Sequence, residues 1–335
     1  MCALFGWLDY KGIIPHKILK KLTQALANAA EERGTDAAGI SYIKDGKVTV
    51  YKRPRAAHLI RFNAPDDTKA IMGHTRMATQ GDKKHNYNNH PFSCVAGDTA
   101  FAFAHNGVLW NDKDLRKKGL IPESHIETDS YVACQLIEQQ GKLDFDSLKY
   151  MAETVEGNFT FTALDQHNSL YIIKGSNPMC LLHFEALGIY IYASTESIMK
   201  NALKKTGLHK FDAEKVDVVE GDILKIDKNG IVSRVEFEYL NSSSHFGWYN
   251  SADYYPIHEE LLLAYCGCYG VDSADVELLL DYGYTPDEVE DMLVDTNLLH
   301  ETLRAIRFDE CESVYDACCG GAWEWEGMPM VKAVL

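Results

Sequence analysis

Met1-Cys2-Ala3-Leu4-Phe5-Gly6-Trp7 opens the chain, and the rest of the sequence is organised around the cysteine at position 2. Removal of Met1 would make Cys2 the N-terminal residue, with a thiol nucleophile and an α-amine on the same residue. Because an α-amine has a pKa of roughly 7.7–8, part of it is unprotonated near neutral pH and able to act as a general base. The alternative is an ordinary buried strand that happens to begin with a cysteine.

The composition is typical of a globular protein. The chain has 335 residues, 46% of them hydrophobic and 24% charged, which is enough for one large domain and a smaller one. The sequence shows no export signal and no apolar run long enough to span a bilayer, so we expect a cytoplasmic protein without membrane association. The nine cysteines show no regular disulfide spacing, and we expect them to be reduced.

The negative charge is confined to the C-terminal part of the chain. Residues 1–244 contain 30 basic and 30 acidic residues, whereas residues 245–335 contain 3 and 19, which accounts for the whole net charge of −16. The lack of a basic face argues against a nucleic-acid partner. The change in charge near residue 245 marks a boundary between two parts of the chain. We expect a catalytic domain at 2–240, a linker at 241–255 and an acidic helical module at 256–335.

The hydrophobic pattern favours an α+β fold with antiparallel sheets, because hairpins outnumber alternating β-α units. Residues 2–9 and the segment from Ile71 predict buried strands, and Asp45-Gly46 predicts a hairpin. Further strands are expected at 101–105, 159–165, 169–174, 179–184, 188–193, 216–226 and 230–238. Helices are expected at 15–32, after a cap at 128–130, at 144–155 and 195–206, and in the tail at 258–265, 273–282, 285–296 and 298–307.

Six ordered motifs resemble the class II glutamine amidotransferase domain, which belongs to the N-terminal-nucleophile hydrolase superfamily. They are Cys2 with Gly6, Arg33-Gly34-x-Asp36-x-x-Gly39, Gly73-His74-Thr75-Arg76-x-Ala78-Thr79-x-Gly81, Asn89-His90-Pro91-Phe92, His105-Asn106-Gly107 and Thr128-Asp129. One such match is weak, but six in this order over the first 240 residues are not expected by coincidence. The resemblance implies a four-layer αββα sandwich, two antiparallel sheets between helices, which agrees with the hydrophobic pattern.

The resemblance also implies an enzyme that hydrolyses the side-chain amide of glutamine, without a cofactor or a metal. Cys2 would form a γ-glutamyl thioester, and Asn106 and Gly107 would donate to the oxyanion of the tetrahedral intermediate. A tight turn is the alternative at these two residues, because it is the usual structure of an isolated Asn-Gly pair.

The substrate pocket needs two opposite charges, because free glutamine carries an α-ammonium and an α-carboxylate. By resemblance, Arg76 would pair with the carboxylate, Asp129 would hold the ammonium, and Thr79 would line the pocket. The alternatives are that Arg76 is a surface charge and Asp129 only a helix cap. Arg33 and Asp36 are expected to brace the nucleophile loop rather than to touch the substrate. The three motif histidines, His74, His90 and His105, are expected to be structural.

Three functions stay open at this point. The first is a glutaminase that passes ammonia to a separate synthase partner, because the tail shows no sugar-isomerase or phosphoribosyltransferase pattern and no phosphate-binding glycine-rich loop. The second is a stand-alone hydrolase of γ-glutamyl amides of larger molecules. The third is a non-catalytic module that senses glutamine and binds a partner. Met77 and Gln80 stand where the sugar-phosphate aminotransferase relatives carry Trp and His, which puts communication with an acceptor domain in question.

The acidic tail favours two interpretations equally, a docking surface for a basic partner or a helical lid on the sandwich. It contains five cysteines, at positions 266, 268, 311, 318 and 319. Their arrangement lacks the paired two-residue spacing usual in zinc sites, and we predict no metal site.

Overall fold

The computed structural model describes residues 2–239 and, beyond them, residues 271–282, 284, 289, 292 and 299–307. The chain divides into two compact units, Met1–Gly247 and Trp248–Leu335. The first unit contains all the residues that the sequence predicts for the active site, and the position of those residues follows from the way its two sheets are assembled.

Two antiparallel sheets form the centre of the first unit. The seven-stranded sheet has the order β11-β9-β10-β1-β4-β2-β3, and the six-stranded sheet has the order β13-β12-β8-β7-β6-β5. The seven strands are β1 (Ala3–Asp9), β2 (Ala37–Lys44), β3 (Lys47–Arg53), β4 (Ala70–Arg76), β9 (Cys180–Phe184), β10 (Ile189–Ala193) and β11 (Glu214–Val216). The six strands are β5 (Phe92–Ala96), β6 (Thr99–Leu109), β7 (Gly157–Asp165), β8 (Leu170–Lys174), β12 (Asp222–Ile226) and β13 (Val232–Glu236).

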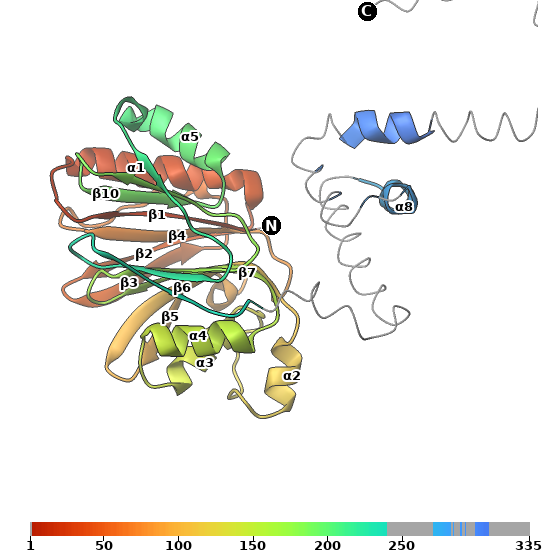
Figure 1. Cartoon of the computed structure of the whole chain (residues 1–335), viewed down its shortest axis with the longest axis horizontal. Coiled ribbons are helices and arrows are strands. Elements are labelled where there is room, and N and C mark those ends of the chain that lie inside the picture. Colours follow the sequence, from red (N-terminus) through yellow and green to blue (C-terminus); the bar gives the residue numbers. More distant parts are fainter. Residues whose placement is uncertain are drawn as a thin grey trace, which may run out of the picture. The chain divides into compact units, whose positions relative to one another are not determined.

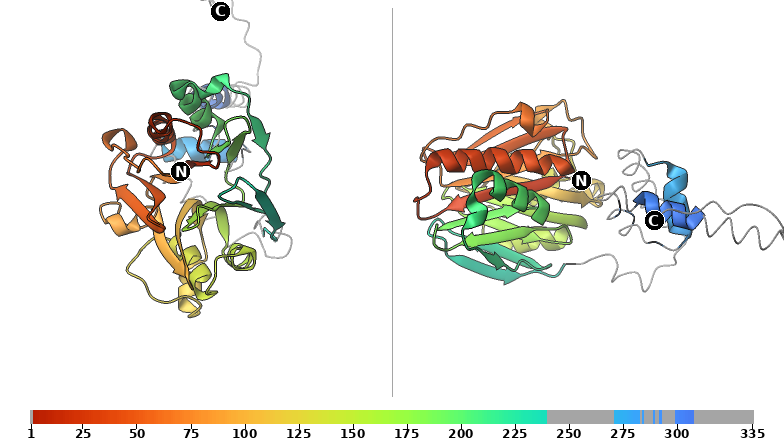
Figure 2. Two further views of the ribbon diagram at one scale, coloured as in Figure 1. Left: turned by 90° about the vertical axis from the view of Figure 1, so that its left-hand side faces the viewer. Right: turned by 90° about the horizontal axis from the view of Figure 1, so that it is seen from above.

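Helices cover the outer face of each sheet, which gives four layers in the order αββα (Figure 1). The seven-stranded sheet carries α1 (His16–Ala29) and α5 (Glu196–Thr206), and the six-stranded sheet carries α3 (Tyr131–Gln139) and α4 (Phe145–Thr154). The short helix α2 (Asp112–Lys117) follows β6. Figure 2 shows α1 and α5 lying together over their sheet from two further directions. The α+β sandwich predicted from the sequence is confirmed.

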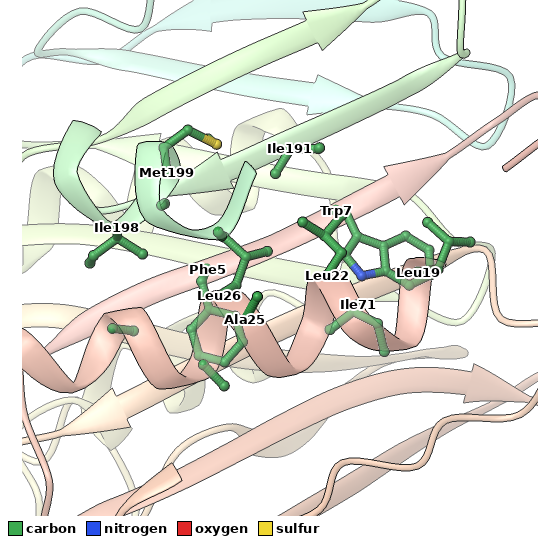
Figure 3. Packing of buried hydrophobic residues seen from close by; sticks show 14 of the residues in the cluster. Phe5, Trp7, Leu19, Leu22, Ala25, Leu26, Ile71, Ile191, Ile198 and Met199 are labelled. Carbon is green, nitrogen blue, oxygen red and sulfur yellow. The ribbon is translucent and has the colours of Figure 1, made fainter. Parts of the chain in front are cut away.

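The central strand β1 contributes to two cores at once. Phe5 and Trp7 pack among side chains of α1 and α5 (Figure 3), whereas Leu4 and Leu8 face the other sheet. Successive side chains of a strand point to opposite faces. A strand that is covered on both faces must therefore be apolar at nearly every position, and all 7 residues of β1 are buried.

Most of the elements expected in the first unit are confirmed, and the strand expected at 216–226 is one of the exceptions. The helix expected at 15–32 is α1 followed by a 3₁₀ turn, Ala30–Arg33. The strand expected at 216–226 is two strands, β11 and β12, which belong to different sheets. Between them the chain crosses from one sheet to the other and turns at Gly221, where φ is +91°. Because Val218 and Val219 in this crossing continue the valine-rich composition of a strand, the sequence pattern did not reveal the crossing.

The second unit has a small apolar core of its own. It contains α8 (Ser273–Asp281) and a helix at 299–307, as the sequence predicts. The side chain of Asp272 accepts a hydrogen bond from Ala274 N at 3.2 Å and so caps α8. Buried side chains from both helices form the core: Val276, Leu279, Leu299, Leu303 and Ile306. The helices expected at 258–265 and 285–296 lie wholly or largely outside the described residues.

The described residues contain neither a membrane-spanning helix nor a metal-binding cluster. None of the helices in this part of the chain is both long enough and apolar enough to cross a bilayer. The same residues include no group of three or more His, Cys, Asp or Glu side chains placed to hold a metal ion. The five tail cysteines lie outside the described residues.

Replacement of Gly6 by alanine should destabilise the sandwich at its centre. An added Cβ would overlap the carbonyl oxygen of Ile71 in β4 and lie 2.7 Å from the hydroxyl of Tyr192 in β10. Because the first of these is a backbone atom, the strands must move, and we expect Gly6→Ala to lower the free energy of unfolding by about 3 kcal/mol. Urea unfolding measures this. Gly46→Ala, in an open hairpin turn at φ +70°, should cost only about 1 kcal/mol, and an equal loss in both variants would contradict the argument.

Candidate active site

Cys2 immediately precedes β1, and its side chain is half-buried. The thiol donates a hydrogen bond to the main-chain oxygen of Met77, with an S–O distance of 3.5 Å. Arg33 Nε donates to the main-chain oxygen of Cys2 at 3.0 Å, so this expected brace contacts the nucleophile residue directly. Burial raises the pKa of the Cys2 thiol, the Arg76 guanidinium lowers it, and the Asp129 carboxylate raises it. The sulfur is therefore within electrostatic reach of both charged residues predicted for the pocket.

The unpaired edge of β6 holds the predicted oxyanion donors. Only the first five residues of β6 pair with β5. Because the N–H groups of alternate residues point to the same side of a strand, Gly107 N–H faces the same edge as Leu109 N–H. The Leu109 N–H donates to Asp129 Oδ2 at 2.7 Å, while Trp110 N–H donates to the residue before β7, on the other side. A backbone donor and the Asp129 carboxylate thus lie along one open strand edge.

The Asn106 side chain is fully buried, and neither of its polar atoms has a hydrogen-bond partner among the described residues. An unsatisfied buried polar group costs about 1–3 kcal/mol. Such a group calls for an explanation, and a role in catalysis is one of those known. The carboxamide therefore has a donor, Nδ2, available for a bound ligand.

The prediction that β6 ends at His105 is wrong, and so is the alternative of a tight turn at Asn106-Gly107. β6 continues to Leu109, with Gly107 opposite Phe159 of β7. The φ of Gly107 is +142°, and an added Cβ would overlap the carbonyl oxygen of Asn158. Glycine is required here because two backbones approach each other closely within a sheet.

Asp129 is buried beside the start of α3, but it does not cap that helix. The residue at the cap position is Ser130, which makes no side-chain capping bond. The Asp129 carboxylate instead accepts from Leu109 N–H and from Ser130 Oγ, the latter at 3.2 Å. Burial raises the pKa of Asp129 to about 6, against the lowering effect of these hydrogen bonds, and the nearby Asp112 raises it further. Near neutral pH the carboxylate is mainly charged and suited to an ammonium group.

Arg76 ends β4, and only 3% of its surface is exposed. One terminal nitrogen donates to Asn89 Oδ1 at 2.7 Å. The other donates to the main-chain oxygens of Gln80 at 2.5 Å and Gly81 at 3.0 Å. The guanidinium has five N–H groups, so these contacts leave it able to donate to a ligand carboxylate. The interpretation of Arg76 as a surface charge is wrong.

The loop after β4 is held by Asp36. Its Oδ2 accepts from Ala78 N–H at 2.9 Å, and its Oδ1 forms an ion pair with Lys83. Asp36 N–H donates to Arg76 O at 2.9 Å. Thr79 lies on this loop with an exposed side chain, which has no hydrogen-bond partner among the described residues. Asp36 thus fixes the segment that carries both Arg76 and Thr79.

The three motif histidines are buried and close to one another. His74 Nε2 donates to His105 O at 2.9 Å, and the rings of His74 and His90 lie 4.3 Å apart. Burial lowers the pKa of His74 and of His105 to about 3, and that of His90 well below its ordinary value. His105 Nδ1 lies 2.8 Å from Ser130 Oγ, whose hydrogen is donated to Asp129. His105, Ser130 and Asp129 thus form one buried series of polar contacts.

Comparison with known proteins agrees with this geometry. Residues 1–160 match the family model of class-II glutamine amidotransferases. They form a class II glutamine amidotransferase domain. The glutamine–fructose-6-phosphate aminotransferase of Staphylococcus aureus is 30% identical over 243 residues, covering 69% of this chain and 38% of that protein. The enzyme of Staphylococcus epidermidis is 28% identical over 232 residues, covering 66% and 37%.

Two solved structures share the fold of the amidotransferase domain. The glutamine phosphoribosylpyrophosphate amidotransferase of B. subtilis superimposes with a TM-score of 0.55 at 22% identity, covering 71% of this chain and 49% of that one. An allosteric regulatory enzyme of purine biosynthesis gives a TM-score of 0.57 at 21% identity, covering 72% and 50%. The chain therefore spans about half of these enzymes and less than half of the aminotransferases.

Sequence reasoning missed two contacts of the amidotransferase domain. Asn89, a residue of the Asn89-His90-Pro91-Phe92 motif, accepts a hydrogen bond from the Arg76 guanidinium. Asp112 is 5% exposed and accepts from Gln80 Nε2 at 3.1 Å. The Asn89-His90-Pro91 motif drew attention to Asn89, but it did not indicate that Asn89 contacts Arg76. Nothing in the sequence linked Gln80 to Asp112, because the contact depends on how the loop after β4 meets the start of α2.

Proposed function

We propose that the amidotransferase domain hydrolyses free glutamine to glutamate and ammonia through a thioester at Cys2. The observation that carries the proposal is the convergence of three features. The Cys2 thiol bonds to the main chain of the residue that follows Arg76, the charges of Arg76 and Asp129 match an α-carboxylate and an α-ammonium, and the buried Asn106 carboxamide has no partner in the described part of the chain. A free amino acid with an amide carbonyl satisfies all of these groups together.

The chemistry begins with removal of the residue before Cys2. The freed α-amine takes the thiol proton, and the sulfur attacks the amide carbon of glutamine. Asn106 Nδ2 and Gly107 N–H stabilise the oxyanion that results. The protonated amine then gives its proton to the leaving nitrogen, ammonia departs, and the γ-glutamyl thioester remains. A water molecule, deprotonated by the same amine, hydrolyses the thioester to glutamate and restores the thiol.

Arg76 and Asp129 bind the two charges of glutamine in this scheme, and Thr79 lines the pocket mouth. Arg33 and Asp36 position the Cys2 backbone and the loop after β4, and His105 contacts Ser130, which donates to Asp129. The test is a stoichiometric assay in which one glutamate and one ammonia appear for each glutamine consumed. A panel of larger γ-glutamyl amides run alongside decides the substrate. If one of these amides is cleaved faster than glutamine, that amide is the substrate. Binding of glutamine without turnover would indicate a sensing module.

We further propose that the ammonia passes to a separate synthase partner. The match covers 38% of the length of the Staphylococcus aureus aminotransferase, and the tail of this sequence shows no sugar-isomerase or phosphoribosyltransferase pattern. In this proposal residues 2–240 are the catalytic domain, residues 241–255 a linker, and the acidic residues 256–335 a surface that docks the partner. We place the protein in the cytoplasm, where thiols such as that of Cys2 are kept reduced. Co-purification of the whole chain with a basic synthase subunit, lost on deletion of residues 256–335, would support this assignment.

Glutamine binding should weaken in acid because of Asp129. Its carboxylate has a pKa of about 6, so protonation below that pH removes the charge that holds the α-ammonium. Protonation of the Cys2 α-amine already lowers kcat/KM below about pH 8. Below pH 6 we expect kcat/KM to fall by a further factor of about ten for each pH unit, chiefly through a rising KM. Asp129→Asn should show a high KM at every pH and should lack this additional fall below pH 6. A fall below pH 6 as steep as in the wild type would assign that titration to another group.

A further inference from the structure

Asn177 lies in the connection between β8 and β9, which passes from one sheet to the other. Its main-chain oxygen accepts from Thr160 Oγ1 at 2.7 Å, and Thr160 is a buried residue of β7. Its side chain reaches past β7 to β6, where Nδ2 donates to the main-chain oxygen of Asn106 at 2.8 Å. Asn177 is thus fixed at its backbone and bonded at its side chain to the peptide that precedes Gly107.

That peptide also contains the proposed oxyanion donor. The C=O of Asn106 and the N–H of Gly107 belong to one planar unit, and in a trans peptide they point in opposite directions. A hydrogen bond that fixes the direction of the carbonyl therefore fixes the direction of the N–H. This bond adds to the restraint that pairing with β7 supplies, at a residue where glycine allows a wide range of backbone conformations and φ is +142°.

The position of the Asn177 side chain agrees with the strand geometry. β6 alternates, so the Asn106 carbonyl faces β7 and the Gly107 N–H faces the open edge beside Asp129. Asn177 Nδ2 lies 2.6 Å from the point that a Cβ of Gly107 would occupy. The space left by the missing side chain is therefore used by the carboxamide that holds the carbonyl.

We propose that Asn177 is a positioning residue that presets the Asn106–Gly107 peptide so that Gly107 N–H points at the oxyanion. The inference rests on the proposed glutamine hydrolysis and adds to it a residue that never touches the substrate. Asn177 acts on the transition state through the backbone of Gly107, because the oxyanion exists only after the sulfur has attacked.

The alternative is that Asn177 only anchors its loop, and Ser176 provides the matched control. Ser176 Oγ donates to Asn158 Oδ1 at 3.2 Å and accepts from Tyr239 at 2.9 Å. Ser176→Ala therefore loosens the same loop without touching the Asn106 carbonyl. Asn177→Asp keeps the shape of the side chain but removes the donor, and Asn177→Ser is too short to reach. Both keep the backbone contact with Thr160.

The experiment measures glutamine hydrolysis by the whole chain and these three variants. Loss of one oxyanion donor costs on the order of 100- to 1,000-fold in kcat, and misdirecting that donor should cost roughly 10- to 100-fold. We expect this fall in kcat and kcat/KM for both Asn177 variants, with the KM for glutamine changed by less than about twofold. Ser176→Ala should keep wild-type kcat. Alkylation of Cys2 by iodoacetamide, which forms no oxyanion, should proceed at the wild-type rate in all variants.

Three kinetic results would overturn the positioning role. They are wild-type kcat in both Asn177 variants, a loss confined to KM, and an equal loss in Ser176→Ala. Slow alkylation of Cys2 in an Asn177 variant would show that the thiol itself is displaced, which also contradicts the proposal. Failure of the proposed function is a separate outcome, because wild-type protein would then release no ammonia from glutamine whatever stands at position 177.

Discussion

Cys2→Ala should abolish glutamine hydrolysis while leaving the fold intact. Loss of the catalytic nucleophile in a hydrolase typically costs on the order of 10⁶-fold in kcat, and we expect a fall of at least about 10⁴-fold here. The fold should persist because Cys2 precedes β1 and its side chain, among the described residues, contributes only the 3.5 Å bond to Met77 O. A hydrogen bond of this kind contributes no more than about 1 kcal/mol. Ammonia release and thermal unfolding measure the two expectations.

Cys180→Ala is the matched control for the nucleophile. Cys180 is a free, buried cysteine of β9, outside the group of residues around Cys2. Its replacement should leave kcat within about twofold of wild type and lower stability modestly through the lost packing. Residual hydrolysis in Cys2→Ala comparable to that of wild type would place the reaction at another nucleophile and end the thioester mechanism.

Asn106→Leu should separate activity from stability. Removal of the Nδ2 donor should lower kcat about 100- to 1,000-fold, which corresponds to about 3–4 kcal/mol of transition-state stabilisation. The same change removes two buried polar atoms that lack partners in the described part of the chain. We therefore expect the free energy of unfolding to stay constant or to rise by about 1 kcal/mol. A steady-state assay and urea unfolding test the two effects on one preparation.

Thr68→Val is the control for Asn106→Leu. The Thr68 hydroxyl is also buried without a partner among the described residues, but it lies in the segment before β4 rather than at the open edge of β6. Thr68→Val should keep wild-type kcat, since the group plays no part in binding or catalysis. If Asn106→Leu retained kcat, or lost stability as a hydrogen-bonded residue would, the oxyanion role of the carboxamide would be refuted.

The parts of the fold predicted correctly are those set by local chemistry. Asp45 and Gly46 have φ values of +51° and +70°, the turn that an Asp-Gly pair between two strands predicts. The helical spacing of apolar residues within 15–32 predicts α1, because one face of that helix must cover the sheet. The sequence of β1 predicts a strand that is buried on both faces. In each case the local structure is determined by residues that are close together in the sequence.

The parts predicted wrongly depend on partners far away in the chain. Asn106-Gly107 has the composition of a turn, but pairing with β7 keeps it extended. Asp129 has the position of a helix cap, but Leu109 N–H draws its carboxylate to β6. The bond from Asn177 to the Asn106 carbonyl spans 71 positions. The motifs named the residues of the site, and long-range backbone pairing decides what each one contacts.

The most direct test of the account is the mass spectrum of the N-terminal peptide after inactivation by 6-diazo-5-oxo-norleucine, an electrophilic analogue of glutamine. We predict one analogue per chain, on Cys2, in a peptide that begins with Cys2 and has an unblocked α-amine. Glutamine should protect against this labelling. A fully active protein that keeps Met1, or an analogue attached to another cysteine, would contradict the claim that one residue supplies both the nucleophile and its base.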